Sequence, residues 1–348
     1  MGRQGGKKNL EFMQAGTGRA MMKGRILVHG GAGSWEEGEK REGEVIPVLR
    51  AAVEAAFPAL VSGFAVDAVA EAVASLEESG VFNAGRGALP NLDDVIELDA
   101  GLMDGESLRA GGVAAVRSVP HPVRLARIVM EKTENVLVVG TGAEKLAGAF
   151  GLLGELHPDA TRREEIEKKR RDYLESPARR WVRELRSSLT GVREGDTVGT
   201  VAMDGEGRFA AATSTGGLSF KIPGRVGDSP VVGHGFYAMR GAGAASTSGI
   251  GEAIARYGLS LRAVNLMADG CGAPSAANES ISGLTSLFGP DTAGIILLDQ
   301  CGLPGLSFNT RGMAVGYGGT GMDTGARIVR REELEEFSKG LFEKIRQK

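Results

Sequence analysis

The stretch Gly195-Asp196-Thr197-Val198-Gly199-Thr200-Val201-Ala202-Met203 marks an abrupt change in the chain. Before it, 18 of the 35 residues at 161–195 carry a charge, which does not suit a protein core. After it, a short apolar run predicts a strand over 197–203, and Asp204-Gly205-Glu206-Gly207 predicts a turn into a second strand over 208–213. The sequence therefore predicts a β-hairpin that begins directly behind a charged segment.

Hydroxyl side chains gather at the open end of this hairpin. Pairing Met203 with Arg208 sets Thr197 opposite Ser214, whereas a turn one residue longer sets it opposite Thr215. A slip of one residue turns every side chain to the other face of a strand, so both registers stay open at this point. A hydroxyl-rich strand pair is also what β-propensity alone produces.

The segment that follows the hairpin carries two opposite charges. Arg225 and Asp228 stand three residues apart in a glycine-rich loop that Pro223 and Pro230 stiffen. A surface ion pair is the plain structural interpretation of such a loop. The functional interpretation is a clamp for a zwitterion, because a guanidinium binds a carboxylate in bidentate fashion and a carboxylate binds an ammonium group.

Outside this region, strands and helices come in blocks and do not alternate strictly, which predicts antiparallel sheets covered by helices. The predicted strands cover 25–29, 95–103, 112–119, 135–139, 293–298 and 306–308. The predicted helices cover 65–76, 123–130, 143–150, 251–257, 261–268 and 332–345, and 179–189 within the charged segment has a helical pattern. The turn after 135–139 imitates a dinucleotide fingerprint, but it lacks the third glycine and the acidic ribose partner.

Composition excludes several classes of protein. In 348 residues, 41 basic and 44 acidic side chains leave a net charge of −3, which argues against a dedicated nucleic-acid binder. Two cysteines, Cys271 and Cys301, form no disulfide framework and fill no four-ligand zinc site. We find no apolar stretch of about 18 residues, so we expect no membrane span. Residues 1–24 read as a loose leader without a secretory signal, which predicts a cytoplasmic protein.

Several motifs together resemble the plant-type asparaginase/isoaspartyl peptidase family of N-terminal-nucleophile hydrolases, from about residue 25 to about residue 319. The hairpin and the charged loop at 197–230 are the most diagnostic part. The others are His29–Gly33, Phe82–Gly85, Glu97-Leu98-Asp99-Ala100 and Phe308-Asn309-Thr310.

The resemblance implies an α+β fold, a four-layer αββα sandwich in a single domain at 25–348. It implies a precursor that cuts itself between Asp196 and Thr197 into chains 25–196, with the charged linker 158–196, and 197–348. It also implies a homodimer of such two-chain protomers. The expected partners are a small-molecule or dipeptide substrate, with no nucleic acid and no membrane.

The resemblance also assigns roles to individual residues. Thr197 is implied to be the nucleophile and Thr215 to hydrogen-bond its hydroxyl. Ser248 and the backbone N–H of Gly249 are implied to form the oxyanion hole, with Asn83 near the scissile region. Substrate binding is implied for Arg225 at the α-carboxylate, Asp228 at the α-ammonium, and Gly249 and Gly251 by backbone.

No cofactor for catalysis is implied, but a structural sodium ion is. Its ligands would be mostly main-chain carbonyls in the loop of Leu76, Glu77, Ser79, Phe82, Ala84 and Arg86. Three positions depart from the family pattern: Ser248 replaces the usual threonine, Ile250 replaces a smaller or polar residue, and Phe220 stands where asparagine is common.

An N-terminal threonine explains how an amidase could work without a well-placed histidine. A free α-amine has a pKa of about 7.7–8.0 and can take the proton of the hydroxyl of its own residue. We therefore expect an enzyme that hydrolyses the β-amide of L-asparagine and β-aspartyl dipeptides through a β-aspartyl ester on Thr197. The alternatives are hydrolysis of N-glycosylated asparagine, as in glycosylasparaginases, and an uncleaved homologue without catalysis. A dinucleotide-binding enzyme is the remote alternative.

Overall fold

The computed structural model describes residues 22–35, 39–156, 163–164, 166–168, 171 and 197–347. Most of the expected leader lies outside these residues. So do the expected helix at 179–189 and most of the charged linker 158–196, including Asp196.

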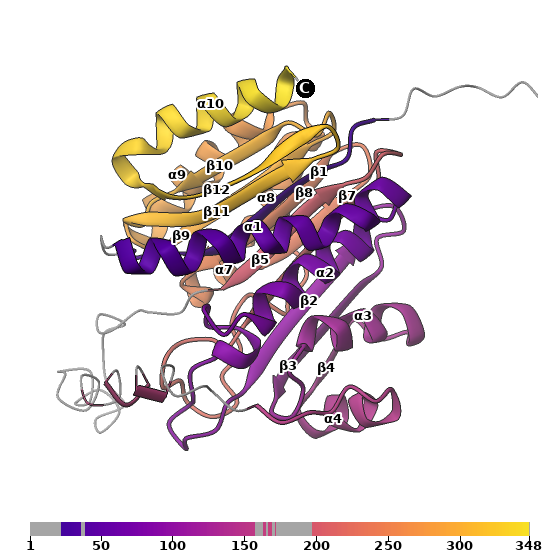
Figure 1. The fold of residues 1–348 in the computed structure, drawn as a ribbon, viewed down its shortest axis with the longest axis vertical. Coiled ribbons are helices and arrows are strands. Elements are labelled where there is room, and N and C mark those ends of the chain that lie inside the picture. The colour runs from indigo at the N-terminus through magenta and orange to yellow at the C-terminus, as the bar shows by residue number, and fades with distance from the viewer. Residues whose placement is uncertain are drawn as a thin grey trace, which may run out of the picture.

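Two β-sheets form the centre of the structure (Figure 1). The larger has eight strands in the order β12-β11-β1-β5-β6-β2-β3-β4, and the smaller has four in the order β10-β9-β8-β7. The strands of the larger sheet are β1 (Arg25–Gly33), β2 (Leu98–Asp104), β3 (Ala110–Val116), β4 (Leu137–Val139), β5 (Val198–Met203), β6 (Phe209–Thr215), β11 (Gly312–Gly319) and β12 (Met322–Arg330). Those of the smaller are β7 (Phe236–Met239), β8 (Gly243–Gly249), β9 (Ala293–Asp299) and β10 (Pro304–Phe308).

Neighbouring strands run antiparallel, apart from the parallel pair β3–β4, which confirms the expectation of antiparallel sheets. The sequence did not reveal β7, β8, β11 or β12. Glycine, alanine and serine fill much of β8 and β11, and these residues carry little β-propensity of their own. Pairing with neighbouring strands, and not local preference, makes these segments extended.

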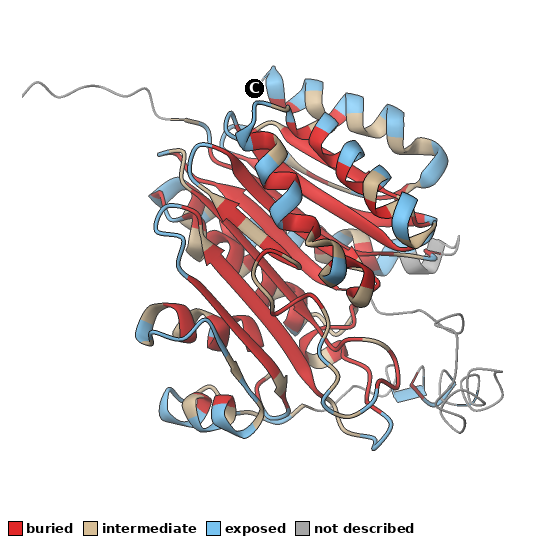
Figure 2. Ribbon diagram, turned by 180° about the vertical axis from the view of Figure 1, so that it is seen from behind, coloured by how far each residue is buried: buried red, intermediate tan, exposed pale blue. Residues whose placement is uncertain are grey.

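Helices cover the outer faces of the sheets, and the strands are the most buried part of the chain (Figure 2). Helices α1, α2 and α3 pack on the larger sheet, α8 and α9 pack on the smaller one, and α10 packs on β10 and β12. A third apolar core lies between the sheets, where β1, β5 and β6 meet β8 and β9. The helices are α1 (Glu39–Ser62), α2 (Ala65–Glu78), α3 (Pro122–Lys132), α4 (Gly140–Ala149), α7 (Gly251–Tyr257), α8 (Leu259–Ala268), α9 (Ala273–Phe288) and α10 (Leu334–Arg346), with 3₁₀ turns η1 (Gly85–Gly87) and η2 (Arg331–Glu333).

Helix α1 contains an apolar stretch of the length that the sequence analysis did not find. Its part Glu42–Ser62 has a mean hydropathy of 1.6 over its most apolar window and is long enough to cross a membrane by length and composition. Alanines and scattered larger apolar residues raise that mean, although charged residues such as Arg50 and Glu54 lie within Glu42–Ser62. In the structure, Val45, Leu49, Val53 and Leu60 are buried and α1 packs on β11, β12 and β1, as in a core helix with one apolar face.

The hairpin β5–β6 has the longer of the two turns considered from sequence. Met203 pairs with Phe209, and Val198 pairs with Ser214. Extending this register by one residue sets Thr197 opposite Thr215. The hydroxyl that faces the start of β5 is therefore the last one of β6.

Candidate active site

Thr197 is the first described residue after the charged linker and directly precedes β5. It is buried, with 4% of its surface exposed. On its other side, β1 pairs with β5, with His29 opposite Gly199. Extending that register sets Thr197 opposite Gly31. Thr197 thus lies in the middle of the larger sheet, between β1 and β6.

Thr215 has a hydroxyl oriented by its own backbone turn. The backbone N–H of Gly217 donates to Oγ1 of Thr215 at 2.9 Å. A threonine hydroxyl can accept one hydrogen bond and donate another. Since Thr197 is the residue across the register, the geometry suits a hydrogen bond from Thr215 to the Thr197 hydroxyl.

Asn83 holds the same turn from the opposite side. Its side-chain nitrogen Nδ2 donates to the carbonyl of Gly217 at 2.6 Å, and its backbone carbonyl accepts from the N–H of Gly216 at 2.7 Å. Its Oδ1 accepts from the N–H of Leu89 at 2.8 Å. Asn83 is therefore placed to hold the backbone behind Thr215 in position.

Ser248 and Gly249 end β8, the strand of the smaller sheet that crosses beneath β5. Oγ of Ser248 is buried and accepts from the N–H of Ala32 at 3.0 Å. Ala32 is the residue after Gly31, so Ser248 is anchored next to the start of β5. Gly249 has φ +142°, a conformation that side chains rarely adopt. Ser248 therefore lies near the end of the larger sheet at which β5 begins.

Arg225 lies among glycines and acidic side chains. Its Nη2 and Nε lie 2.8 and 2.9 Å from Oε1 of Glu252. A Cβ at Gly251 would stand 2.8 Å from Nη2 of Arg225 and 2.9 Å from Oδ1 of Asp228, so both charged groups border one glycine. The structure thus brings together three of the four residues predicted to bind substrate, Arg225, Asp228 and Gly251, and it adds Glu252, which no sequence pattern marks.

Asp228 is buried at the base of this group. Burial raises the pKa of Asp228 to about 6, although the nearby positive charge of Arg225 lowers it. Oγ1 of Thr247 donates to Oδ2 of Asp228 at 3.2 Å. A buried carboxylate with so few donors can gain much from a cationic partner such as an ammonium group.

A second set of buried polar residues was missed from sequence. Lys221 and Asp99 form an ion pair, with Nζ 3.6 Å from Oδ2, and both side chains are almost wholly buried. Oε2 of Glu97, in turn, accepts from the N–H of Gly224 in the charged loop at 2.8 Å. The motif Glu97-Leu98-Asp99-Ala100 had been noted, but strand alternation alone does not show what its carboxylates contact.

His29 is also buried near Thr197. Its Nε2 lies 2.8 Å from Oγ of Ser246, which in turn donates to the carbonyl of Ala212 at 3.4 Å. Burial lowers the pKa of His29 to about 3, so its ring is neutral at physiological pH. The histidine packs against the strands and carries no charge to the site.

The loop expected to bind sodium follows α2. A Cβ at Gly85 would stand 2.5 Å from the carbonyl oxygen of Glu77, and one at Gly87 would stand 2.5 Å from that of Gly80, so carbonyl groups pack closely against the glycines of this loop. Oγ of Ser79 and the N–H groups of Ala84 and Gly87 donate to the carbonyls of Leu76, Phe82 and Ala84. Arg86 instead points to Glu78, with Nε 2.8 Å from Oε1.

Side chains offer little for a metal ion. Within the described residues, no group of three or more His, Cys, Asp or Glu side chains could hold one. The Glu77 side chain is buried against His121, 3.5 Å from its Nδ1, and burial raises the pKa of Glu77. A cation in this loop would therefore depend on main-chain carbonyls.

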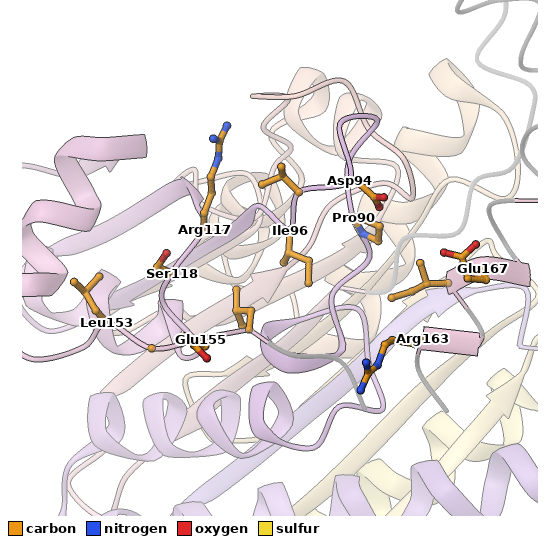
Figure 3. A pocket seen from close by; sticks show the side chains of 13 residues that line it. Pro90, Asp94, Ile96, Arg117, Ser118, Leu153, Glu155, Arg163 and Glu167 are labelled. Carbon is orange, nitrogen blue, oxygen red and sulfur yellow. The ribbon is translucent and has the colours of Figure 1, made fainter. Parts of the chain in front are cut away.

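A cavity of about 890 Å³ has a lining that does not include Thr197. Figure 3 shows the residues that line it. Arg117, Arg163, Glu155 and Glu167 contribute charged side chains to its lining, alongside apolar residues such as Ile96 and Leu153. The cavity contains none of the residues predicted for catalysis, so size alone does not locate the active site.

Comparison with known proteins shows the family of this chain. The family model described as Asparaginase matches residues 22–325. Plant-type L-asparaginase of Pyrobaculum calidifontis is 44% identical over 303 residues, which cover 85% of this chain and 97% of that protein. Plant-type L-asparaginase of Thermococcus kodakarensis is 42% identical over 302 residues, 86% of this chain and 97% of that protein. Isoaspartyl peptidase of Escherichia coli is 39% identical over 322 residues, which cover 88% of this chain and 96% of that protein. The chain belongs to the asparaginase family.

Proposed function

We propose that this protein is a hydrolase that cleaves the β-amide of L-asparagine and of β-aspartyl dipeptides with Thr197 as its nucleophile. The observation that carries the proposal is the placement of Thr197 at the start of β5, between the hydroxyl of Thr215 and the strand that holds Ser248. The names of the relatives, plant-type L-asparaginase and isoaspartyl peptidase, support the same two substrates.

The proposed reaction has two steps. Oγ1 of Thr197 attacks the β-carbonyl carbon of the substrate while the α-amine of Thr197 takes the hydroxyl proton. Negative charge on the carbonyl oxygen is stabilised by the Ser248 hydroxyl and the N–H of Gly249. The C–N bond breaks, the leaving amine takes the proton, and a β-aspartyl ester on Thr197 remains. Water then hydrolyses the ester, which releases aspartate and restores the threonine hydroxyl.

Arg225 and Asp228 recognise the part that both substrates share. The guanidinium binds the α-carboxylate and the buried carboxylate binds the α-ammonium, each by charge-assisted hydrogen bonds. Both groups border Gly251, where a side chain would fill the space between them. The substrate's two charges then fix the β-amide against Thr197.

This chemistry requires a cut before Thr197, because an amide nitrogen in an intact chain cannot accept a proton. We infer that the Thr197 hydroxyl attacks the carbonyl of Asp196, which breaks the peptide C–N bond, frees the α-amine and leaves an ester on Oγ1 of Thr197. Water then hydrolyses this ester, so that residues 1–196 and 197–348 separate into two chains. Intact mass spectrometry of purified protein tests this directly. Two masses are expected for the parent and one full-length mass for Thr197→Ala, which is also expected to lose asparagine hydrolysis.

A full-length parent that hydrolyses asparagine, or a Thr197→Ala variant with parental activity, would contradict the nucleophile assignment. A single uncleaved mass without activity would favour the non-catalytic homologue. Release of the sugar from an N-glycosylated asparagine is the assay that separates the glycosylasparaginase alternative.

We further infer that the two sheets and their covering helices are the four-layer αββα sandwich of N-terminal-nucleophile hydrolases. Its support is the apolar core between the sheets and the helices packed on each outer face. The homodimer and the sodium ion stay proposals. Light scattering on the cleaved protein tests the first, and thermal melting in sodium against N-methylglucamine chloride tests the second.

A further inference from the structure

The buried pair Lys221–Asp99 has no role in the mechanism above. Nζ of Lys221 lies 3.6 Å from Oδ2 of Asp99 and donates to the carbonyl of Glu97 at 3.2 Å. Only 1% of the Lys221 side chain and none of the Asp99 side chain is exposed. An ion pair that is buried so completely adds little to stability by itself. Its position relative to the turn behind Thr215 is therefore the feature that needs an explanation.

Lys221 lies against the turn that orients Thr215. A Cβ at Gly217 would stand 3.1 Å from Nζ of Lys221 and 3.4 Å from Nη1 of Arg225. Gly217 has φ +79°, and its N–H donates to Oγ1 of Thr215. The lysine therefore packs against Gly217, the residue whose N–H binds the Thr215 hydroxyl.

Asp99 fixes the other end of this arrangement. It pairs with Thr215 in the β2–β6 register, and its Oδ1 accepts from the N–H of Ala115 at 2.8 Å. The aspartate on β2 is thereby tied to both neighbouring strands, β6 and β3. Lys221 spans from this strand to the turn at Gly217.

We propose that Lys221, held by Asp99, is a positioning residue that sets the Thr215 hydroxyl toward Thr197 by bracing Gly217. The inference rests on the proposed function, since it concerns the hydroxyl that assists Thr197. The charged groups around Nζ are Asp99, Glu97 and Arg225. Asn83 donates to the Gly217 carbonyl, so Lys221 and Asn83 both lie against the same residue, Gly217.

A double-mutant cycle separates this role from general support of the fold. Lys221→Met keeps most of the side-chain length and removes the charge, and Thr215→Ala removes the hydroxyl that Lys221 is proposed to orient. In the parent, Lys221→Met is expected to lower kcat on asparagine by about 10- to 100-fold, since small misplacements of a reacting group cost this much. The KM is expected to change by less than about threefold, because a transition-state contact is lost.

In the Thr215→Ala background, the same substitution is expected to lower kcat by less than about threefold, because no hydroxyl is left to misplace. Lys221→Arg, which restores the charge, is expected to recover most of the activity. Lys339→Met is the matched control: this lysine on α10 pairs with Glu335 at the surface and should leave kcat unchanged. All kinetics are normalised to the cleaved fraction measured by mass spectrometry.

An equal loss of kcat in both backgrounds, or a parental kcat in folded and cleaved Lys221→Met, would overturn the proposal. Should Lys221→Met not fold, Asp99→Asn takes its place in the same cycle, with the same expected pattern. Failure of both variants to fold would assign the pair to the fold and also overturn it. A cleaved parent that hydrolyses neither asparagine nor β-aspartyl peptides contradicts the proposed function instead, which the first assay of the series detects.

Discussion

The hydroxyl oxygen of Ser248 accepts a hydrogen bond from the backbone N–H of Ala32, at 3.0 Å. Serine lacks the methyl group that restricts the rotamer of the threonine found in the family pattern. The bond from Ala32 supplies that restriction, since it holds Oγ in place and leaves the hydroxyl proton free to donate. A serine at this position can therefore serve as a preorganised donor.

Ser248→Ala is expected to lower kcat by about 10²–10³-fold, the usual loss when one oxyanion donor is removed, with a smaller change in KM. Ser248→Thr is expected to keep activity, because the hydroxyl remains. Steady-state hydrolysis of asparagine by the cleaved variants measures both. An unchanged kcat in the alanine variant would remove Ser248 from the oxyanion hole.

The acid limb of the pH profile is expected to have two slopes. Protonation of the Thr197 α-amine lowers log(kcat/KM) by about one unit per pH unit below about 7.7–8.0. Asp228, whose pKa burial raises to about 6, must be ionised to bind an ammonium group, so the slope should steepen to about two below that pH. Measuring kcat/KM from pH 4.5 to 8 on the parent and on Asp228→Asn tests this. Asp228→Asn is expected to have a low kcat/KM whose logarithm keeps a slope of about one. A slope of one down to pH 4.5 in the parent would exclude the role of Asp228.

The same pKa affects folding in the opposite direction. Because burial raises the pKa of Asp228 from 3.8 to about 6, folded protein keeps a proton in that window that unfolded protein has lost. The contribution of Asp228 to stability therefore falls as pH rises from about 4 to about 6. In urea unfolding, Asp228→Asn is expected to gain stability relative to the parent over this window as pH rises. A constant difference across it would contradict the raised pKa.

Arg225 is expected to bind the α-carboxylate of the substrate, which competes with the Glu252 carboxylate for the guanidinium. A charge-assisted hydrogen bond contributes about 1.5–3 kcal/mol, so Arg225→Ala should lower kcat/KM on asparagine by about 10- to 150-fold. Its activity on the α-carboxamide analogue should fall much less. If the folded, cleaved variant discriminates between the two substrates as strongly as the parent, Arg225 does not bind that carboxylate.

Phe220 occupies a conformation that suits a glycine or an asparagine. Its φ is +53°, in the left-handed region that a bulky residue adopts at a cost of about 1–2 kcal/mol. Phe220→Gly is therefore expected to be more stable than Phe220→Ala, by about 1 kcal/mol. At Phe209, a buried strand residue of β6, the order should be reversed. Thermal melting of the four variants checks both orders, and the same order at both positions would contradict the strain.

The sequence by itself determined the family and supplied most of the candidate site residues. The boundary at Thr197, the hydroxyls of the hairpin, and the Arg225/Asp228 loop are local patterns, readable without any knowledge of distant contacts. Antiparallel sheets also followed from the order of the strong elements. Strands such as β8 escaped, because segments of glycine, alanine and serine become extended only when neighbouring strands pair with them.

The tertiary structure alone decided which groups meet. The register that sets Thr197 opposite Thr215 depends on the length of one turn, and composition cannot distinguish the two lengths. The pairing of Arg225 with Glu252 and of Lys221 with Asp99 joins segments 27 and more than 100 residues apart. Such contacts arise from how sheets and loops pack, and the free energy of burying a charge beside its partner exists only once the chain has folded.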